Sequence, residues 1–446
     1  MQPRTLTIAL GAALVTTLVG VRAEAGTASA QTIAMHGATA TRAGVVDVPA
    51  GSGGLEQLPF RTYATGSAAG TPAPTTAQDT RSPLLSIALG AQRTPALADS
   101  DNSVGLTPPD MGLGADSTHV VQMVNVVGRI WTGTSASAAF QLDAFFLASG
   151  HFVSDPWVLF DQESGRWFAG IFDVSLGGEE IAVSRTGDPT GTWAVYVIQY
   201  PGVSGGGCPD QGKGGVDSNV VALGFNEYSG NGCSGGFLGA GIEIFNKAQM
   251  VAGTSVNFVY TNPLPQYFSL VPAQALSSGQ TTEFFAGHDM NSTSQALHRV
   301  TSVGVPGGTV TLTALADLTL AHPYPAPPKA KQPGTANKLR SGDQRMQHVV
   351  WKAGVGLLMT WGEGCTPAGD TKVRACGRVV ATNDGVTSPA VTMDAELAKK
   401  GRHYVYPAAT LNSANDVVVA FGVTSGKIFP QLDAAAAALE LDQPLR

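Results

Sequence analysis

The chain has 446 residues, with 13% charged residues, 43% hydrophobic residues and a formal net charge of −7. It contains no run of Lys and Arg and no basic segment interleaved with aromatic residues, which argues against nucleic acid as a partner. The 55 glycines and the low charge content favour a β protein rich in turns. The hydrophobic content is sufficient to form a core.

The first 25 residues have the pattern of a secretory signal peptide. Arg4 precedes an apolar run from Leu6 to Val21, and the small-residue pattern Ala23-Glu24-Ala25 follows it. This run is short for a membrane span, so we expect cleavage after Ala25 and a mature chain without a membrane span. An uncleaved membrane anchor is the alternative. The protein is therefore expected to be secreted, either to the extracellular space or to the periplasm.

Residues 26–82 are predicted to be a low-complexity leader. The stretch ATGSAAGTPAPTTAQDTRSP contains small, polar and proline residues that bury little apolar area. From residue 83 to residue 432 the pattern changes to short strand-forming runs separated by Gly, Pro, Asn and Asp. Residues 433–446 form an Ala-rich tail with helix-forming composition. The prediction is thus one domain, 83–432, between a leader and a tail.

Strand–turn–strand units recur throughout residues 83–432. In PWVLFDQESGRWFAGIFD (156–173), two apolar runs flank the turn residues Asp161 and Gly165, which predicts a hairpin. Related units begin near residues 119, 218, 270, 347 and 404. Their spacing of roughly 40 to 75 residues is compatible with propeller blades that carry insertions. We therefore expect an all-β propeller of six mostly four-stranded blades. Seven blades, or a last blade that is incomplete, are variants of this prediction, and a β-sandwich and a β-helix are the alternatives.

The opening hairpin also tests the propeller prediction. Trp167 and Phe168 are adjacent, so their side chains point to opposite faces of one strand. In a propeller both faces of a blade pack against neighbours, and both aromatic residues should be buried. A proline-rich segment, 321–343, is predicted to be an insertion between blades.

The four cysteines are expected to form two disulfides, because the count is even and the protein is predicted to be exported. Three pairings are possible. The local one, Cys208 with Cys233 and Cys365 with Cys376, closes only short loops. A zinc site is the alternative, but the sequence has no C-x-x-C motif and no histidine cluster.

Four segments in this order resemble a group of secreted bacterial β-propeller proteins of unassigned function, loosely allied to the Asp-box (BNR) repeat proteins. They are TPPDMGLGADSTHVVQMVN, SDPWVLFDQESGRWFAGIFD, AVSRTGDPTGTWAVYVI and PDQGKGGVDSNVVALGFNEY. The resemblance covers most of residues 83–430. Members of the group continue beyond the FPQL segment with a motif rich in Arg, Trp, Gly and Asp, which the Ala-rich tail replaces here.

One segment, SRTGDPTGTWAVY (184–196), is similar to an Asp-box. Asp188 is followed by Gly191 and Trp193, one residue out of the common spacing. In such a motif the carboxylate braces a hairpin turn and the tryptophan packs between blades. We therefore expect Asp188 to have a structural role.

Candidate ligand-binding residues stand where the repeated strands end. Asn125, Asp173, Asn226 and Asp289 each follow an apolar strand, and Glu363 follows LLMTW. If the units superpose as blades, these side chains form a polar ring at one mouth of the axial channel. Such a ring could bind sugar hydroxyls or a cation, with Ca²⁺ as the candidate ion and no cofactor required. The alternative is that they form Asx-turns at strand ends.

The sequence carries no distinct enzyme motif. The arginines are scattered and the R-I-P segment of sialidases is absent, which argues against sialidase activity. A glycosidase would need two carboxyls roughly 5 to 9.5 Å apart. We therefore expect an exported propeller that binds an extracellular glycan or a surface protein. The alternatives are a polysaccharide hydrolase or lyase that uses carboxylates at the channel mouth, and a purely structural scaffold.

Overall fold

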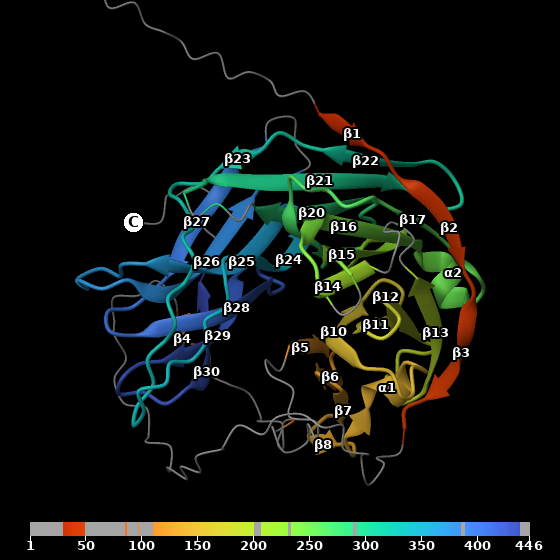
Figure 1. Ribbon diagram of the computed structural model, residues 1–446, viewed down its shortest axis with the longest axis horizontal. Coiled ribbons are helices and arrows are strands. Elements are labelled where there is room, and N and C mark those ends of the chain that lie inside the picture. Colours follow the sequence, from red (N-terminus) through yellow and green to blue (C-terminus); the bar gives the residue numbers. More distant parts are fainter. Residues whose placement is uncertain are drawn as a thin grey trace, which may run out of the picture.

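The computed structural model describes residues 30–49, 85–86, 97, 110–199, 207–230, 233–288, 291, 293–384 and 389–437. The predicted signal peptide, most of the predicted leader and Asp289 lie outside these ranges. Strands dominate the described residues, and sheets are arranged around a central axis as a β-propeller (Figure 1). The all-β propeller prediction is confirmed.

Four full blades of four strands each form most of the ring. Blade I comprises β10 (Val153–Asp161), β11 (Arg166–Asp173), β12 (Gly178–Ser184) and β13 (Thr192–Gln199). Blade II comprises β14 (Gly207–Val216), β15 (Val220–Ser229), β16 (Phe237–Asn246) and β17 (Val256–Tyr260), with α2 (Lys247–Ala252) before its last strand.

Blade III comprises β18 (Phe268–Pro272), β20 (Thr282–His288), β21 (Ala296–Gly304) and β22 (Val310–Ala314), and β23 (Leu318–Thr319) also pairs with β21. Blade IV comprises β24 (Met346–Lys352), β25 (Gly356–Cys365), β26 (Arg374–Thr382) and β27 (Val391–Leu397). The short strand β19 (Gln274–Ala275) pairs in parallel with β14 and β24 and so joins blades II and IV into one ten-stranded sheet.

Two further sheets, each with strands of only two residues, precede and follow the full blades. The first sheet contains β5 (Met111–Ala115), β6 (His119–Val124), β7 (Val127–Thr132), β8 (Ser135–Ala136) and β9 (Phe140–Gln141), and α1 (Leu142–Phe145) follows it. The last sheet contains β28 (His403–Leu411), β29 (Val417–Thr424), β30 (Gln431–Ala437) and β4 (Leu85–Ser86). The predicted count of six or seven blades is wrong, because four blades are complete.

At both ends of the described chain, strands form inside the segments predicted to be a leader and a tail. Residues inside the range 26–82 form β1 (Gln31–Ile33), β2 (His36–Ala40) and β3 (Arg42–Asp47). These strands pair with the last strands of blades III, II and I, and they run as one strap along the outer rim (Figure 1). At the other end, the first Ala residues of the predicted tail continue β30, and β4 pairs with β30 as the fourth strand of the last sheet.

Apolar cores lie between successive sheets, so each blade is buried on both faces. The predicted hairpin is confirmed: β10 pairs with β11, and Gly165 closes the turn with a positive φ of 62°. Trp167 packs into the core toward the first sheet, whereas Phe168 packs into the core toward blade II. Both side chains are 0% exposed, which confirms burial on both faces of the strand.

The two local disulfides are confirmed. Cys208 and Cys233 have their Cα atoms 5.2 Å apart, and those of Cys365 and Cys376 are 5.9 Å apart. Both separations lie in the usual disulfide range. The first bridge ties the start of β14 to the residues that precede β16, and the second joins β25 to β26 within blade IV.

Candidate functional site

The first strands of the blades carry an irregularity at the same place, near their N-terminal ends. Register shifts interrupt β10 between Ser154 and Trp157 and β14 between Asp210 and Lys213, and comparable shifts interrupt β18, β24 and β28. Non-glycine residues with positive φ stand at the irregularities of β10, β14, β18 and β28 (Asp155, Gln211, Ser269 and Tyr406), and Asp110 has positive φ just before β5. Such backbone is strained for L-residues, and bulges reorient side chains. This repeated feature therefore indicates where a functional site could lie.

Three aspartates from consecutive sheets meet at these irregularities, and we name them the axial carboxyl cluster: Asp110, Asp155 and Asp210. The Asp155 side chain shares a hydrogen bond with each of the other two. Burial, followed by the Asp155 carboxyl, raises the pKa of Asp110 from 3.8 to about 6. The same two causes raise the pKa of Asp210 from 3.8 to about 7. Below about pH 7 the cluster therefore retains a proton.

Cations and phenols surround the axial carboxyl cluster. Lys213 acts electrostatically on Asp110, and Arg345 acts on Asp210. Asp343 holds the Arg345 guanidinium in bidentate fashion, with Nε–Oδ1 and Nη2–Oδ2 distances of 2.8 Å each. Burial raises the pKa values of Tyr228 and Tyr406, with a further contribution from Asp210 to Tyr228 and from Asp110 to Tyr406. The site thus combines carboxyls, amine and guanidinium donors, and two aromatic rings.

Two of the predicted ring residues, Asn125 and Asn226, are buried and hydrogen-bond to residues with positive φ. Asn125 is 1% exposed; its Nδ2 donates to Asp110 Oδ2 (3.1 Å) and its Oδ1 accepts from the backbone N–H of Asp155 (2.9 Å). Asn226 makes the equivalent contacts two sheets further along the chain, where its Oδ1 accepts from the backbone N–H of Ser269 and its Nδ2 donates to the Ser269 hydroxyl, both at 2.8 Å. Each amide therefore holds a positive-φ residue of the following blade.

The remaining predicted residues have other surroundings. Asp173 is 0% exposed, accepts from the backbone N–H of Leu176 (2.8 Å) and contacts His151 Nδ1 (2.5 Å), which are the contacts of a turn former with an added histidine contact. Glu363 is 0% exposed and accepts from Arg378 Nη1 at 3.2 Å. Burial raises the pKa of Glu363 to about 7, against the lowering effect of Arg378. Asp289 lies outside the described residues.

The axial aspartates were not predicted from the sequence as site residues. A local signal for them exists, since each stands next to a proline or within one residue of a Pro-Asp pair: PPDMG, SDPW and CPDQG. Proline is tolerated at bulges and at strand starts. An Asp next to a Pro, repeated at the first strand of three consecutive sheets, would have identified them.

A possible metal triad lies away from the axis. Ligand atoms of His322, Glu363 and Glu396 lie within 4.8 Å of one another. The Arg378 guanidinium already occupies this group, because its Nη1 is 3.0 Å from His322 Nδ1 and 3.2 Å from Glu363 Oε2. His322 Nδ1 also lies 3.0 Å from the backbone carbonyl of Pro323, and its Nε2 lies 3.4 Å from Glu396 Oε1. The contacts therefore fit an Arg–His–Glu network better than a metal centre.

The Asp-box-like segment has the structural role that was predicted for it. Asp188 Oδ1 accepts from the backbone N–H of Thr190 at 2.9 Å. Trp193 is 0% exposed and packs edge-on against Phe145. Asp188 thus braces a turn, and the tryptophan fills the core between the first sheet and blade I.

No helix within the described ranges is long and apolar enough to cross a membrane.

Comparison with known proteins gives structural likeness only. No family model matches the sequence, and no curated protein matches it. Among solved structures, an exo-β-1,3-galactanase from Clostridium thermocellum is similar with a TM-score of 0.35 and 9% identity, over 77% of this chain and 76% of that one. An α-L-arabinofuranosidase from Podospora anserina has a TM-score of 0.32 and 11% identity, over 57% of this chain and 83% of that one. The NanB sialidase from Streptococcus pneumoniae has a TM-score of 0.26 and 9% identity, over 73% of this chain and 83% of that one.

These neighbours are glycan-active propeller enzymes, but at such low similarity the function of this chain has to be argued from its own residues. The resemblance to secreted propeller proteins likewise stays a prediction.

Proposed function

We propose that the protein binds an extracellular glycan through the axial carboxyl cluster. The observation that carries this proposal is the convergence of Asp110, Asp155 and Asp210 from three consecutive sheets. Carboxyl oxygens accept hydrogen bonds from sugar hydroxyls, and aromatic rings pack against the CH faces of sugar rings. Tyr228 and Tyr406 supply rings beside the cluster.

A glycan fits this site better than a surface protein does. The three carboxyls are largely buried, so a ligand has to present small polar groups to them rather than a broad apolar surface. Lys213 and Arg345 add donors that can bind ring or glycosidic oxygens. Exported location, which the predicted signal peptide and the two disulfides favour, would give the protein access to such a ligand.

The test is a glycan-array screen of the wild-type protein, followed by calorimetric titration of the best ligand into variants. We expect Asp155→Asn and Asp210→Asn each to weaken binding about tenfold or more, equivalent to about 1.4 kcal/mol. The matched control is Asp47→Asn, because Asp47 is exposed on β3 of the strap. Wild-type affinity in both axial variants, or no glycan bound by the wild type, would contradict the proposal.

Hydrolysis of the bound glycan is the second candidate, and the pKa of Asp210 favours it. A carboxyl whose pKa is raised to about 7 can act as a general acid beside a second carboxyl. Glycosidases hold their two carboxyls roughly 5 to 9.5 Å apart. Because Asp155 and Asp210 share a hydrogen bond, a substrate would have to separate them, which ranks hydrolysis second.

Reducing-sugar release from polysaccharides between pH 4 and pH 8 separates the two candidates. If hydrolysis occurs, activity should fall as the pH rises through about 7, where Asp210 loses its proton. Asp210→Asn should then abolish release. A glycan that is bound but recovered intact would leave binding as the function, and neither binding nor release would indicate a scaffold.

A further inference from the structure

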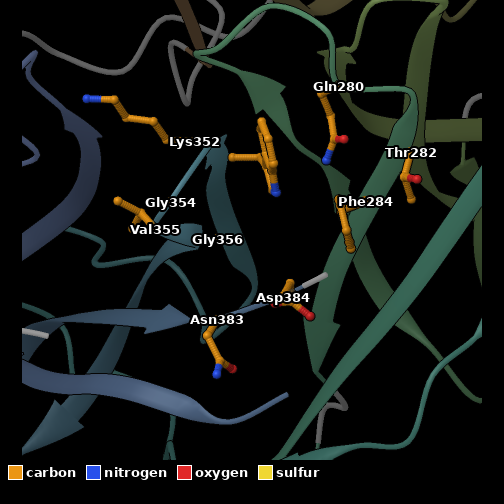
Figure 2. Close-up of a pocket in the computed structure, with 10 residues that line it drawn as sticks. Gln280, Thr282, Phe284, Lys352, Gly354, Val355, Gly356, Asn383 and Asp384 are labelled. Atoms are coloured by element: carbon orange, nitrogen blue, oxygen red, sulfur yellow. The ribbon is translucent and has the colours of Figure 1, made fainter. Parts of the chain in front are cut away.

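A second cavity lies at the other end of the ring from the axial carboxyl cluster. It measures about 410 Å³ and opens between blades III and IV (Figure 2). Its lining includes the last residues of β24, Trp351 and Lys352, whereas Arg345, beside the axial cluster, immediately precedes β24. A seven-residue strand spans about 20 Å, so the cavity is separate from the axial site. Its volume falls within the usual range of small-ligand sites.

The lining combines aromatic surface with polar groups that have no partner. Trp351 and Phe284 supply the apolar part. Within the described ranges, the side chains of Gln280 and Thr282 form no hydrogen bond, and the indole N–H of Trp351 is buried without an acceptor. Asn383 uses its Oδ1 to accept from the backbone N–H of Ala390 (2.5 Å), which leaves its amide N–H groups available. A buried unpaired N–H is costly, so these groups suit a ligand that can hydrogen-bond.

The charged groups at this cavity are already paired. The Asp384 carboxylate is held by the buried Arg299 guanidinium and by the Thr382 hydroxyl. Lys352 donates through Nζ to the backbone carbonyl of Asn412 at 2.5 Å, and Figure 2 shows its ammonium directed away from Gln280, Phe284 and Asp384. Because neither Asp384 nor Lys352 presents an unpaired charge to the cavity, a neutral ligand fits it best.

We propose that this cavity is a second ligand site, which binds a neutral saccharide unit. The sugar's CH face would pack on the Trp351 ring, and its hydroxyls would bond to Gln280, Thr282 and Asn383. Hydroxyls donate and accept together, as the amides and the threonine hydroxyl do, whereas a purely apolar ligand would leave those groups unpaired. The site does not depend on the axial carboxyl cluster, with which it shares no residue.

In the experiment, the full-length protein is titrated with neutral hexoses, pentoses and their trisaccharides, and binding is measured by calorimetry and by tryptophan fluorescence. We expect a change in emission on binding that Trp351→Phe removes. Gln280→Ala and Thr282→Val should each weaken binding about tenfold. The matched control is Gln199→Ala, an exposed glutamine at the end of β13. Circular dichroism and melting temperature establish that each variant is folded.

The two sites are distinguished by the double variant Asp155→Asn, Asp210→Asn. It should lose ligand at the axial cluster and keep saccharide binding in the second cavity, so failure of one proposal leaves the other standing. The inference is overturned if no neutral saccharide binds, or if binding persists unchanged in Gln280→Ala and Thr282→Val. It is equally overturned if only uronic acids bind and Lys352→Ala abolishes their binding.

Discussion

Glu180 on β12 gives the protein a predictable dependence of stability on pH. Its side chain is 2% exposed, and burial followed by repulsion from Asp173 raises its pKa from 4.5 to about 9. A carboxyl whose pKa is raised by folding stabilises the folded state fully below its unfolded pKa, and this contribution is lost as the pH rises through the folded pKa. The window is therefore pH 4.5 to about 9. At pH 7, 2.5 pH units above the unfolded value, the loss is about 3 kcal/mol.

Replacing Glu180 by Gln removes this titration but keeps a donor toward Asp173. We expect Glu180→Gln to match the wild type near pH 4 and to exceed its free energy of unfolding by about 3 kcal/mol at pH 7. Urea unfolding, followed by tryptophan fluorescence at several pH values, measures the difference. The control is Glu163→Gln, because Glu163 is exposed in the β10–β11 turn. A variant with the same pH dependence as the wild type, or one less stable at pH 7, would refute the reasoning.

The core and the disulfides give two further predictions. Trp167→Ala and Phe168→Ala should each lower the free energy of unfolding by about 3 to 5 kcal/mol in urea titrations, because each removes a fully buried aromatic side chain. Similar losses for both residues are required if blade I is buried on both faces, and a small loss for either would contradict that packing. Without reduction, the protein should not react with thiol reagents. Reduction of each disulfide should lower the free energy of unfolding by roughly 2 to 4 kcal/mol. Peptide mapping that finds a cross-pair would contradict the assignment.

Features that depend on local pattern could be predicted from the sequence. The β10–β11 hairpin follows from turn residues between two strand-forming runs, and burial of Trp167 and Phe168 follows from strand geometry within a propeller. The disulfide pairing follows from short loops in a chain with four cysteines. These inferences need only the nearest residues and the period of a strand.

Features that depend on residues distant in the sequence could not be predicted from the sequence. The strap residues Gln31–Asp47 form strands because blades I, II and III offer unpaired outer edges, and nothing within the strap itself specifies those edges. The Ala residues of β30 favour a helix in isolation, but pairing with β29 on one side and β4 on the other overrides that preference. The blade count was also wrong, because the first and last sheets are completed only by strands of two residues, β8 and β9 in the first and β4 in the last.

The axial site shows why strand ends alone were an incomplete guide to function. Asn125 was identified at the end of β6, yet its amide contacts the backbone of Asp155, thirty residues further on in the next blade. A non-glycine residue at positive φ costs on the order of 1 to 3 kcal/mol, so it persists only where neighbours hold it. Asn125 holds Asp155 in this way, and Asn226 holds Ser269. The two buried amides thus maintain the strained backbone conformation of the following blade. Asp155, which we propose as a ligand-binding residue, and Asn125, which positions it, therefore lie on neighbouring sheets, so the interface between sheets is part of the proposed site.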